Sequence, residues 1–173
     1  MNRALLLLIV LGAALPWGVA LAMWPDLPAR IPTHFDAGGL PDAWGDRGEW
    51  WLLPIVATLI SVVAGGIALL VRWIARAHPE LINVPSKEAF LRLDEGARLA
   101  VLQPVVRFSV VLVFATQGLM SYLQIGTVRV AKGLSSTLPS LPIFLFAGVV
   151  LVAVIFLVLA LRRRIAEEVA RQG

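Results

Sequence analysis

The side chains best suited to chemistry or binding lie in one short segment of the chain, residues 24–51. His34 lies close in sequence to Asp36 and Asp42, and Glu49 follows as a further candidate. An imidazole beside carboxylates suits zinc, iron or manganese, and it equally suits a polar ligand or partner. The spacing matches no established zinc signature, because there is no HExxH motif and no second histidine nearby.

The sequence allows three interpretations of His34. As a structural staple, its ring bonds a carboxylate or a backbone carbonyl and holds the segment closed, and we favour this because metal sites demand more ligands than we can place here. The others are recognition of a ligand or partner, and metal binding. We take His34, Asp36, Asp42 and Trp44 as candidate ligand-binding residues, with Trp44 also expected to anchor the packing of the segment. We predict no catalytic residue, no metal site and no cofactor.

The rest of the chain is strongly apolar. Of its 173 residues, 59% are hydrophobic and 15% charged, with a mean hydropathy of +0.85, whereas soluble domains are about 45–50% apolar and about 25% charged. This composition excludes disorder, a coiled coil and an ordinary water-soluble domain. The chain contains no cysteine, which excludes disulfides, thiolate metal sites and cysteine nucleophiles.

Four stretches lack Asp, Glu, Lys, Arg and His and are long enough to cross a membrane as helices: residues 4–23, 50–71, 108–128 and 138–161. A span needs about 20 apolar residues, and a lipid-exposed backbone must pair its own polar groups. We therefore predict an all-α integral membrane protein, a single domain over residues 1–173 with four transmembrane helices. The first stretch also resembles a signal peptide ending at Ala20-Leu21-Ala22, but its length favours a retained helix.

Eleven of the fifteen basic residues fall at the amino end, in the connection 72–107 and in the tail after residue 161. The positive-inside rule places these parts, and hence both termini, in the cytoplasm. The acidic connection 24–49 then faces outward. Contact with lipid headgroups explains the net charge of +4, so we expect the bilayer as partner and no nucleic acid.

The outward connection 24–49 is rich in proline and glycine, yet we expect it to form an ordered extracytoplasmic cap between the first two helices. Proline lowers the entropic cost of ordering. Residues 31–35 suggest a short extended segment, and Gly38-Gly39 with Pro41-Asp42 suggest turns. The packing residues are Leu27, Ile31, Phe35, Leu40 and Trp44, and the tryptophans at the outer membrane boundary are Trp24, Trp50 and Trp51.

Polar groups within the spans are few. Gln117 lies near the middle of the third stretch, where an interhelical hydrogen bond is favoured over a substrate or ion contact. No ionisable residue lies deep in any span. Proton relays and ion-coupled carriers usually need one, so the pattern argues against a secondary transporter.

The connection 72–107 is expected to lie on the inner leaflet. His78 marks the end of a helix before Pro79. Ser86 is a candidate cap for an amphipathic piece whose apolar residues are Phe90, Leu91 and Leu93 and whose basic residues are Lys87, Arg92 and Arg98. This piece suits the membrane surface or a cytoplasmic partner. In the tail we expect an ion pair between Glu167 and Arg171.

Two motifs carry a resemblance to a known family. The first is Leu27-Pro28-x-x-Ile31-Pro32-Thr33-His34-Phe35-Asp36-x-x-Gly39-x-Pro41-Asp42-x-Trp44, and the second is Asn83-Val84-Pro85-Ser86-Lys87-Glu88-x-Phe90-Leu91-x-Leu93. Over residues 20–95 the chain resembles a domain of unknown function in bacterial membrane proteins, which forms the amino-terminal part of SdpI-type bacteriocin immunity proteins. The resemblance implies a multi-pass protein of the bacterial plasma membrane.

Three functional hypotheses follow. The first is a non-enzymatic protein with an immunity-like or envelope-regulatory role, which recognises a membrane-active peptide, a lipid or a membrane protein through the cap. The second is a metal-assisted membrane hydrolase that uses His34, Asp36 and Asp42. The third is a small subunit or assembly factor of a membrane complex. The sequence does not set the oligomeric state. Because the polar candidates come mainly from one loop, binding is favoured over catalysis.

Overall fold

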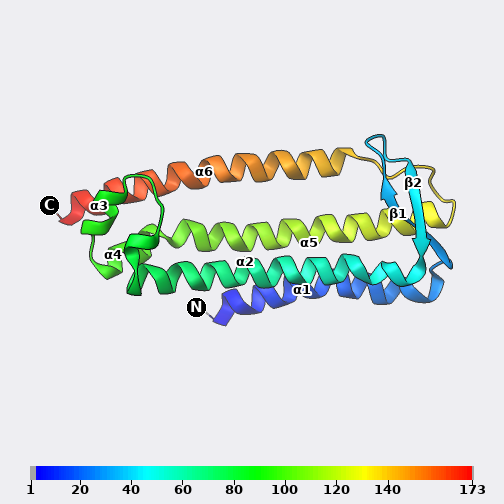
Figure 1. The fold of residues 1–173 in the computed structure, drawn as a ribbon, viewed down its shortest axis with the longest axis horizontal. Helices are drawn as coiled ribbons and strands as arrows, with labels where there is room; N and C mark the ends of the chain where they lie inside the picture. Colours follow the sequence, from blue (N-terminus) through cyan, green and yellow to red (C-terminus); the bar gives the residue numbers. More distant parts are fainter. Residues whose placement is uncertain (1–2, 173) are drawn as a thin grey trace.

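The computed structural model describes residues 3–172 and is dominated by helices (Figure 1). The four long helices are α1 (Arg3–Met23), α2 (Leu52–Ala77), α5 (Gln103–Ala131) and α6 (Leu141–Gln172), and the two short ones are α3 (Lys87–Arg92) and α4 (Glu95–Val101). Short 3₁₀ helices are η1 (Trp24–Asp26), η2 (Arg47–Trp51) and η3 (Pro79–Leu81), and the strands are β1 (Arg30–Phe35) and β2 (Pro41–Asp46).

Three helical stretches are long and apolar enough to cross a membrane: Arg47–Ala77, Glu95–Ala131 and Leu141–Arg171. The α1 helix forms without interruption over the first predicted stretch, despite Pro16 in its interior. Helix α5 extends beyond its predicted span at both ends, and α2 and α6 extend beyond theirs at the carboxyl end, because the charged residues that follow the apolar stretches continue the helix. The predicted start of the second span, residues 50–51, lies in η2. At the start of the fourth stretch the prediction is wrong, since residues 138–140 precede α6.

Buried amides join three of the long helices. The Gln117 side chain is fully buried on α5 and donates to the Ala57 carbonyl at 3.0 Å and to the Ser61 hydroxyl at 2.5 Å, both on α2. Gln124, two turns further along α5, donates to the Pro16 carbonyl of α1 at 3.1 Å. The interhelical hydrogen bond expected of Gln117 is confirmed. These bonds fix how α1 and α2 pack on α5.

The segment between α1 and α2 is a β-hairpin, so the all-α prediction is wrong here. Strands β1 and β2 pair antiparallel, with Arg30 opposite Asp46 and Phe35 opposite Pro41, and irregularities interrupt the register near His34. The extended segment expected at residues 31–35 is confirmed. Pro41-Asp42, expected to form a turn, begins β2 instead, because the turn is completed earlier, at residues 36–40.

The hairpin lies across the ends of α1, α2 and α5 (Figure 1). Leu27 and Ile31 are buried there, together with Trp50, against Ala20 and Val128. The turn is bonded to the connection between α5 and α6, where the Leu138 N–H donates to the Gly39 carbonyl at 2.8 Å. Leu138 itself is buried and covers Gly126 of α5. Leu40, expected to pack, is 51% exposed.

At the opposite end, α3 and α4 pack against α2 and the carboxyl-terminal part of α6 (Figure 1). Phe90 and Leu93 are buried in this cluster with Leu161 and Ile165. The end of α6 therefore covers these two apolar residues of the amphipathic piece. Leu91 stays 38% exposed.

The sequence also makes three local predictions at this end: a cap, a helix end and an ion pair. Ser86 precedes α3 but makes no side-chain cap, because it adopts a left-handed conformation with φ of 57°. His78 ends α2 as expected, and its backbone N–H donates a hydrogen bond to the Ile74 carbonyl at 2.8 Å. In the tail, the expected pair is wrong: Glu167 pairs with Arg163 at 2.7 Å, and Arg171 with Glu168 at 2.9 Å.

Gly39 allows a test of how the hairpin turn docks. It has φ of +81°, and an added Cβ would overlap the Leu138 carbonyl, whereas Gly133 has φ of +69° with nothing near its missing Cβ. Both alanine substitutions strain the backbone by about 1 kcal/mol, but Gly39→Ala must also displace the Leu138 contact, for about 1–2 kcal/mol more. Denaturant unfolding in detergent micelles should show the larger loss of unfolding free energy for Gly39→Ala. Equal losses for the two variants would contradict this docking.

Candidate functional site

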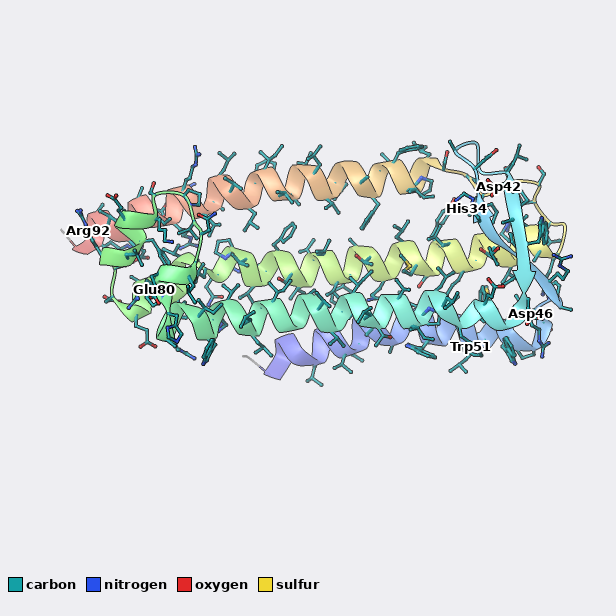
Figure 2. All side chains as sticks on the ribbon, viewed as in Figure 1. His34, Asp42, Asp46, Trp51, Glu80 and Arg92 are labelled. Atoms are coloured by element: carbon teal, nitrogen blue, oxygen red, sulfur yellow. The ribbon has the colours of Figure 1, made fainter. Side chains whose placement is uncertain are left out.

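His34 and Asp42 form a hydrogen bond across the two strands of the hairpin. The His34 Nδ1 and Asp42 Oδ1 atoms are 2.5 Å apart, with side chains 68% and 47% exposed. Figure 2 shows the two side chains together at the hairpin end, far from Glu80 and Arg92. A ring bonded to a carboxylate on the neighbouring strand is the arrangement expected of a staple, and its exposure also leaves it accessible to a partner.

Asp36 makes different contacts from those of His34 and Asp42. Its Oδ1 atom accepts the Leu40 N–H at 2.9 Å, and its backbone N–H donates to the Leu40 carbonyl at 2.9 Å. The carboxylate thus closes the hairpin turn. Within residues 3–172, no group of three or more His, Asp or Glu side chains lies close enough to hold a metal ion, so His34, Asp36 and Asp42 are not brought together as ligands.

Trp44 is not the anchor of the hairpin. It is 43% exposed, and its carbonyl accepts the Arg30 guanidinium at 3.2 Å. The anchor is Trp50, which is 1% exposed and donates its indole N–H to the Ala20 carbonyl at 3.1 Å. The Trp50 ring is enclosed by protein.

Two other tryptophans at this end lie beside each other. Trp24 and Trp51 have ring centroids 5.0 Å apart, and the Arg47 guanidinium lies 4.4 Å from the Trp24 ring centroid. Both rings are half-buried. Half-buried aromatic rings with a cation nearby are typical of the boundary between membrane and water.

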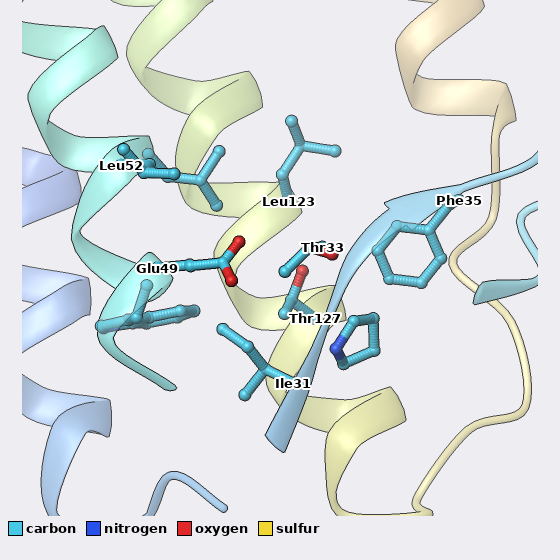
Figure 3. Close-up of a pocket in the computed structure, with 10 residues that line it drawn as sticks. Ile31, Thr33, Phe35, Glu49, Leu52, Leu123 and Thr127 are labelled. Atoms are coloured by element: carbon cyan, nitrogen blue, oxygen red, sulfur yellow. The ribbon is translucent and has the colours of Figure 1, made fainter. Parts of the chain in front are cut away.

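A recess of about 180 Å³ opens beside the hairpin (Figure 3). Its walls are mostly apolar, and three polar side chains from different elements point into it: Thr33 from β1, Glu49 from η2 and Thr127 from α5. The apolar lining comes from Ile31, Pro32, Phe35, Trp50, Leu52, Leu53 and Leu123. An apolar hollow with a few convergent polar groups is the usual form of a small-ligand site.

The position of the Glu49 carboxylate is fixed locally. Its Oε1 atom accepts the Asp46 N–H at 3.3 Å, and Asp46 in turn accepts the Gly48 N–H at 2.7 Å, which completes a capping box at the start of η2. A Cβ at Gly45 would overlap this carboxylate. Glycine at position 45 therefore leaves room for Glu49 to lie against the hairpin.

Thr127 brings an unused hydroxyl to the recess. The residue is 5% exposed, and within residues 3–172 its hydroxyl makes no hydrogen bond. A carboxylate and two hydroxyls above an apolar floor suit an aliphatic group that ends in a cation, because a charge-assisted hydrogen bond favours the positive group at the carboxylate.

Sequence reasoning named Glu49 as an additional candidate but missed Thr33 and Thr127. Thr127 lies far along the chain on another helix, and nothing in its sequence neighbourhood marks it as part of a site. Its recognition depends on knowing that the end of α5 lies beneath the hairpin.

The family match covers the first of the two motifs that carry the resemblance, residues 27–44. Residues 11–58 match the family described as "Domain of unknown function (DUF1648)". An uncharacterized protein of Archaeoglobus fulgidus is 36% identical over 85 residues, which are 49% of this chain and 46% of that protein. The chain therefore spans about half the length of this relative. No solved structure matches the chain.

The anchoring role of Trp50 can be measured against that of Trp44. In Trp50→Phe the Ala20 carbonyl loses a buried donor, for a cost of about 1–3 kcal/mol. In Trp44→Phe the ring is exposed and the unfolding free energy should change by less than about 0.5 kcal/mol. Denaturant unfolding in micelles compares the two variants, and a larger effect at Trp44 would reverse the assignment of the anchor.

Proposed function

We propose that the chain is a four-span protein of the plasma membrane that recognises a cationic, membrane-active peptide through the hairpin, which faces away from the cytoplasm. The observation that carries the proposal is the recess beside the hairpin, where Glu49, Thr33 and Thr127 converge on an apolar floor. Three helices apolar enough to cross a membrane support a membrane protein. Protection against a toxic peptide, as the resemblance to SdpI-type immunity proteins implies, is one form of this activity.

The distribution of charge supports the proposed sidedness. The hairpin lies at one end of the bundle (Figure 1). The other end contains α3 and α4, the carboxyl-terminal ends of α2 and α6 and the start of α5. That end carries ten of the fifteen Lys and Arg residues: Arg72, Arg76, Lys87, Arg92, Arg98, Arg107, Arg162, Arg163, Arg164 and Arg171. A basic end is typical of the cytoplasmic side.

The α1 helix supplies the fourth proposed span. Its 21 residues extend for about 32 Å at 1.5 Å per residue, which is enough to cross a hydrocarbon core of about 30 Å. With α1 crossing the membrane, the hairpin that follows it and the recess beneath lie on the outer side.

Residues 24–49 attract cations as a whole, since they contain five acidic and two basic residues. Such an excess accelerates the approach of a basic peptide. His34, Asp42 and Trp44 are exposed on the hairpin and offer its first contacts, and the recess then takes an aliphatic side chain that ends in a cation, such as that of lysine. Because Asp36 closes the turn, we do not include it among the contacts.

A binding experiment tests this function with a matched pair of variants. The probe is a synthetic amphipathic peptide of leucine and lysine without tryptophan, titrated against the protein in nanodiscs while the fluorescence of the protein is followed, since Trp50 lines the recess. Glu49→Gln keeps the capping acceptor but removes the charge, and should weaken binding roughly fivefold. Glu88→Gln removes one charge at the opposite end and should bind like the unmodified protein.

Two results would contradict the proposal. One is equal binding of the leucine–lysine peptide and its leucine–glutamate counterpart, which would remove the role of charge. The other is unchanged affinity in Glu49→Gln and in a triple variant of His34, Asp42 and Trp44 to alanine, which would remove the role of the hairpin.

A further inference from the structure

Helix α6 is fixed at its two ends but not along its middle. At one end Leu138 is bonded to Gly39, and at the other Leu161 and Ile165 are buried against α3 and α4. Between them, no residue in the most apolar window of α6 is buried by the described part of the protein. Figure 1 shows α6 set apart from the group formed by α1, α2 and α5.

Two apolar crevices flank the middle of α6. One, of about 650 Å³, lies between α5 and α6, with walls that include Phe108, Val111, Phe144, Val152 and Phe156. The other, of about 450 Å³, lies between α2, α5 and α6 and shares Phe108 with the first. Both open at the surface that the proposed topology places in the hydrocarbon region, where an apolar space fills with lipid chains rather than water.

The larger crevice also contains a single cation. Arg107 lines it, directly before the charge-free stretch of α5 that starts at Phe108. Its side chain is exposed, and within residues 3–172 it forms no ion pair or hydrogen bond. Arg107 lies at the basic end of the bundle, so the crevice runs from a free guanidinium into an apolar space.

We propose that this crevice binds an anionic phospholipid of the inner leaflet, with the phosphate on Arg107 and an acyl chain between α5 and α6. A guanidinium pairs well with phosphate, and basic pockets between membrane helices hold anionic headgroups. A lipid supplies the anion and the apolar chain in one molecule at this depth. A helix from a second copy would fill the apolar space but leave Arg107 without an anion, so charge complementarity favours the lipid.

The inference rests on the membrane insertion and orientation of the proposed function but not on peptide recognition, and its test is separate. The protein is purified in mild detergent and exposed to equal amounts of phosphatidylglycerol and phosphatidylethanolamine, and retained lipid is counted by native mass spectrometry. The unmodified protein should retain the anionic lipid preferentially. Arg107→Gln should lower the ratio of anionic to zwitterionic lipid roughly fivefold, and Arg107→Lys should restore most of it.

Matched controls separate a specific site from general attraction. Arg92→Gln removes an exposed cation at the same end and should retain lipid like the unmodified protein. Gly148→Leu and Gly66→Leu each add a side chain where the missing Cβ has no neighbour, but Gly148 lines the crevice. Gly148→Leu should therefore reduce total bound lipid, whereas Gly66→Leu should not.

Three results would overturn the inference. One is a ratio in Arg107→Gln equal to that of the unmodified protein. Another is an equal fall in Arg92→Gln, which would show attraction by net charge alone. The last is a lipid-free dimer that Gly148→Leu converts to a monomer, because a second copy would then occupy the crevice.

Discussion

The hydrogen bond from the buried Trp50 indole to the Ala20 carbonyl is the interaction on which the rest of the structure depends. Ala20 lies in the last turn of α1, where carbonyls have no partner within the helix. The indole supplies that partner and draws the start of α2 against the end of α1. At the hairpin turn, the Leu138 N–H donates to the Gly39 carbonyl, so the segment formed by the hairpin and η2 is bonded to both sides of the bundle.

The recess follows from this docking. A hairpin fixed at both sides covers the end of α5 without filling the space above Leu123 and Thr127, and η2 then directs Glu49 into that space. The same packing leaves no residue of the most apolar window of α6 buried, although the helix contacts α5 as well as α3 and α4. The proposed peptide site therefore lies at the hairpin end of the bundle, whereas the proposed lipid site runs from Arg107 along the middle of α6.

The sequence predicts the long helices well, because a charge-free apolar run has few alternatives to a helix in a membrane. It also predicts the Gln117 bond, since a buried amide must find a partner. It does not predict the hairpin partner of residues 31–35, because Pro41 and Gly45 in β2 are typical of turns. Here the tertiary contacts at Gly39 and Trp50 outweigh local preference. For the same reason, the sequence assigns the anchoring role to Trp44, whereas Trp50 is the anchor in the structure. Both are tryptophans near the expected membrane boundary, and which of them is buried depends on the elements that pack around it.

The central claim is that the hairpin is docked on the bundle and faces outward. Cysteine labelling in spheroplasts tests this claim most directly, because the chain has no cysteine of its own. Ala43 is exposed on β2, while Ile31 on β1 is 3% exposed beneath the hairpin. We predict that a membrane-impermeant maleimide modifies Ala43→Cys rapidly and leaves Ile31→Cys unmodified. Rapid modification of both would show an undocked segment, and modification of Ala43→Cys only after lysis would place the hairpin in the cytoplasm; either result contradicts the account.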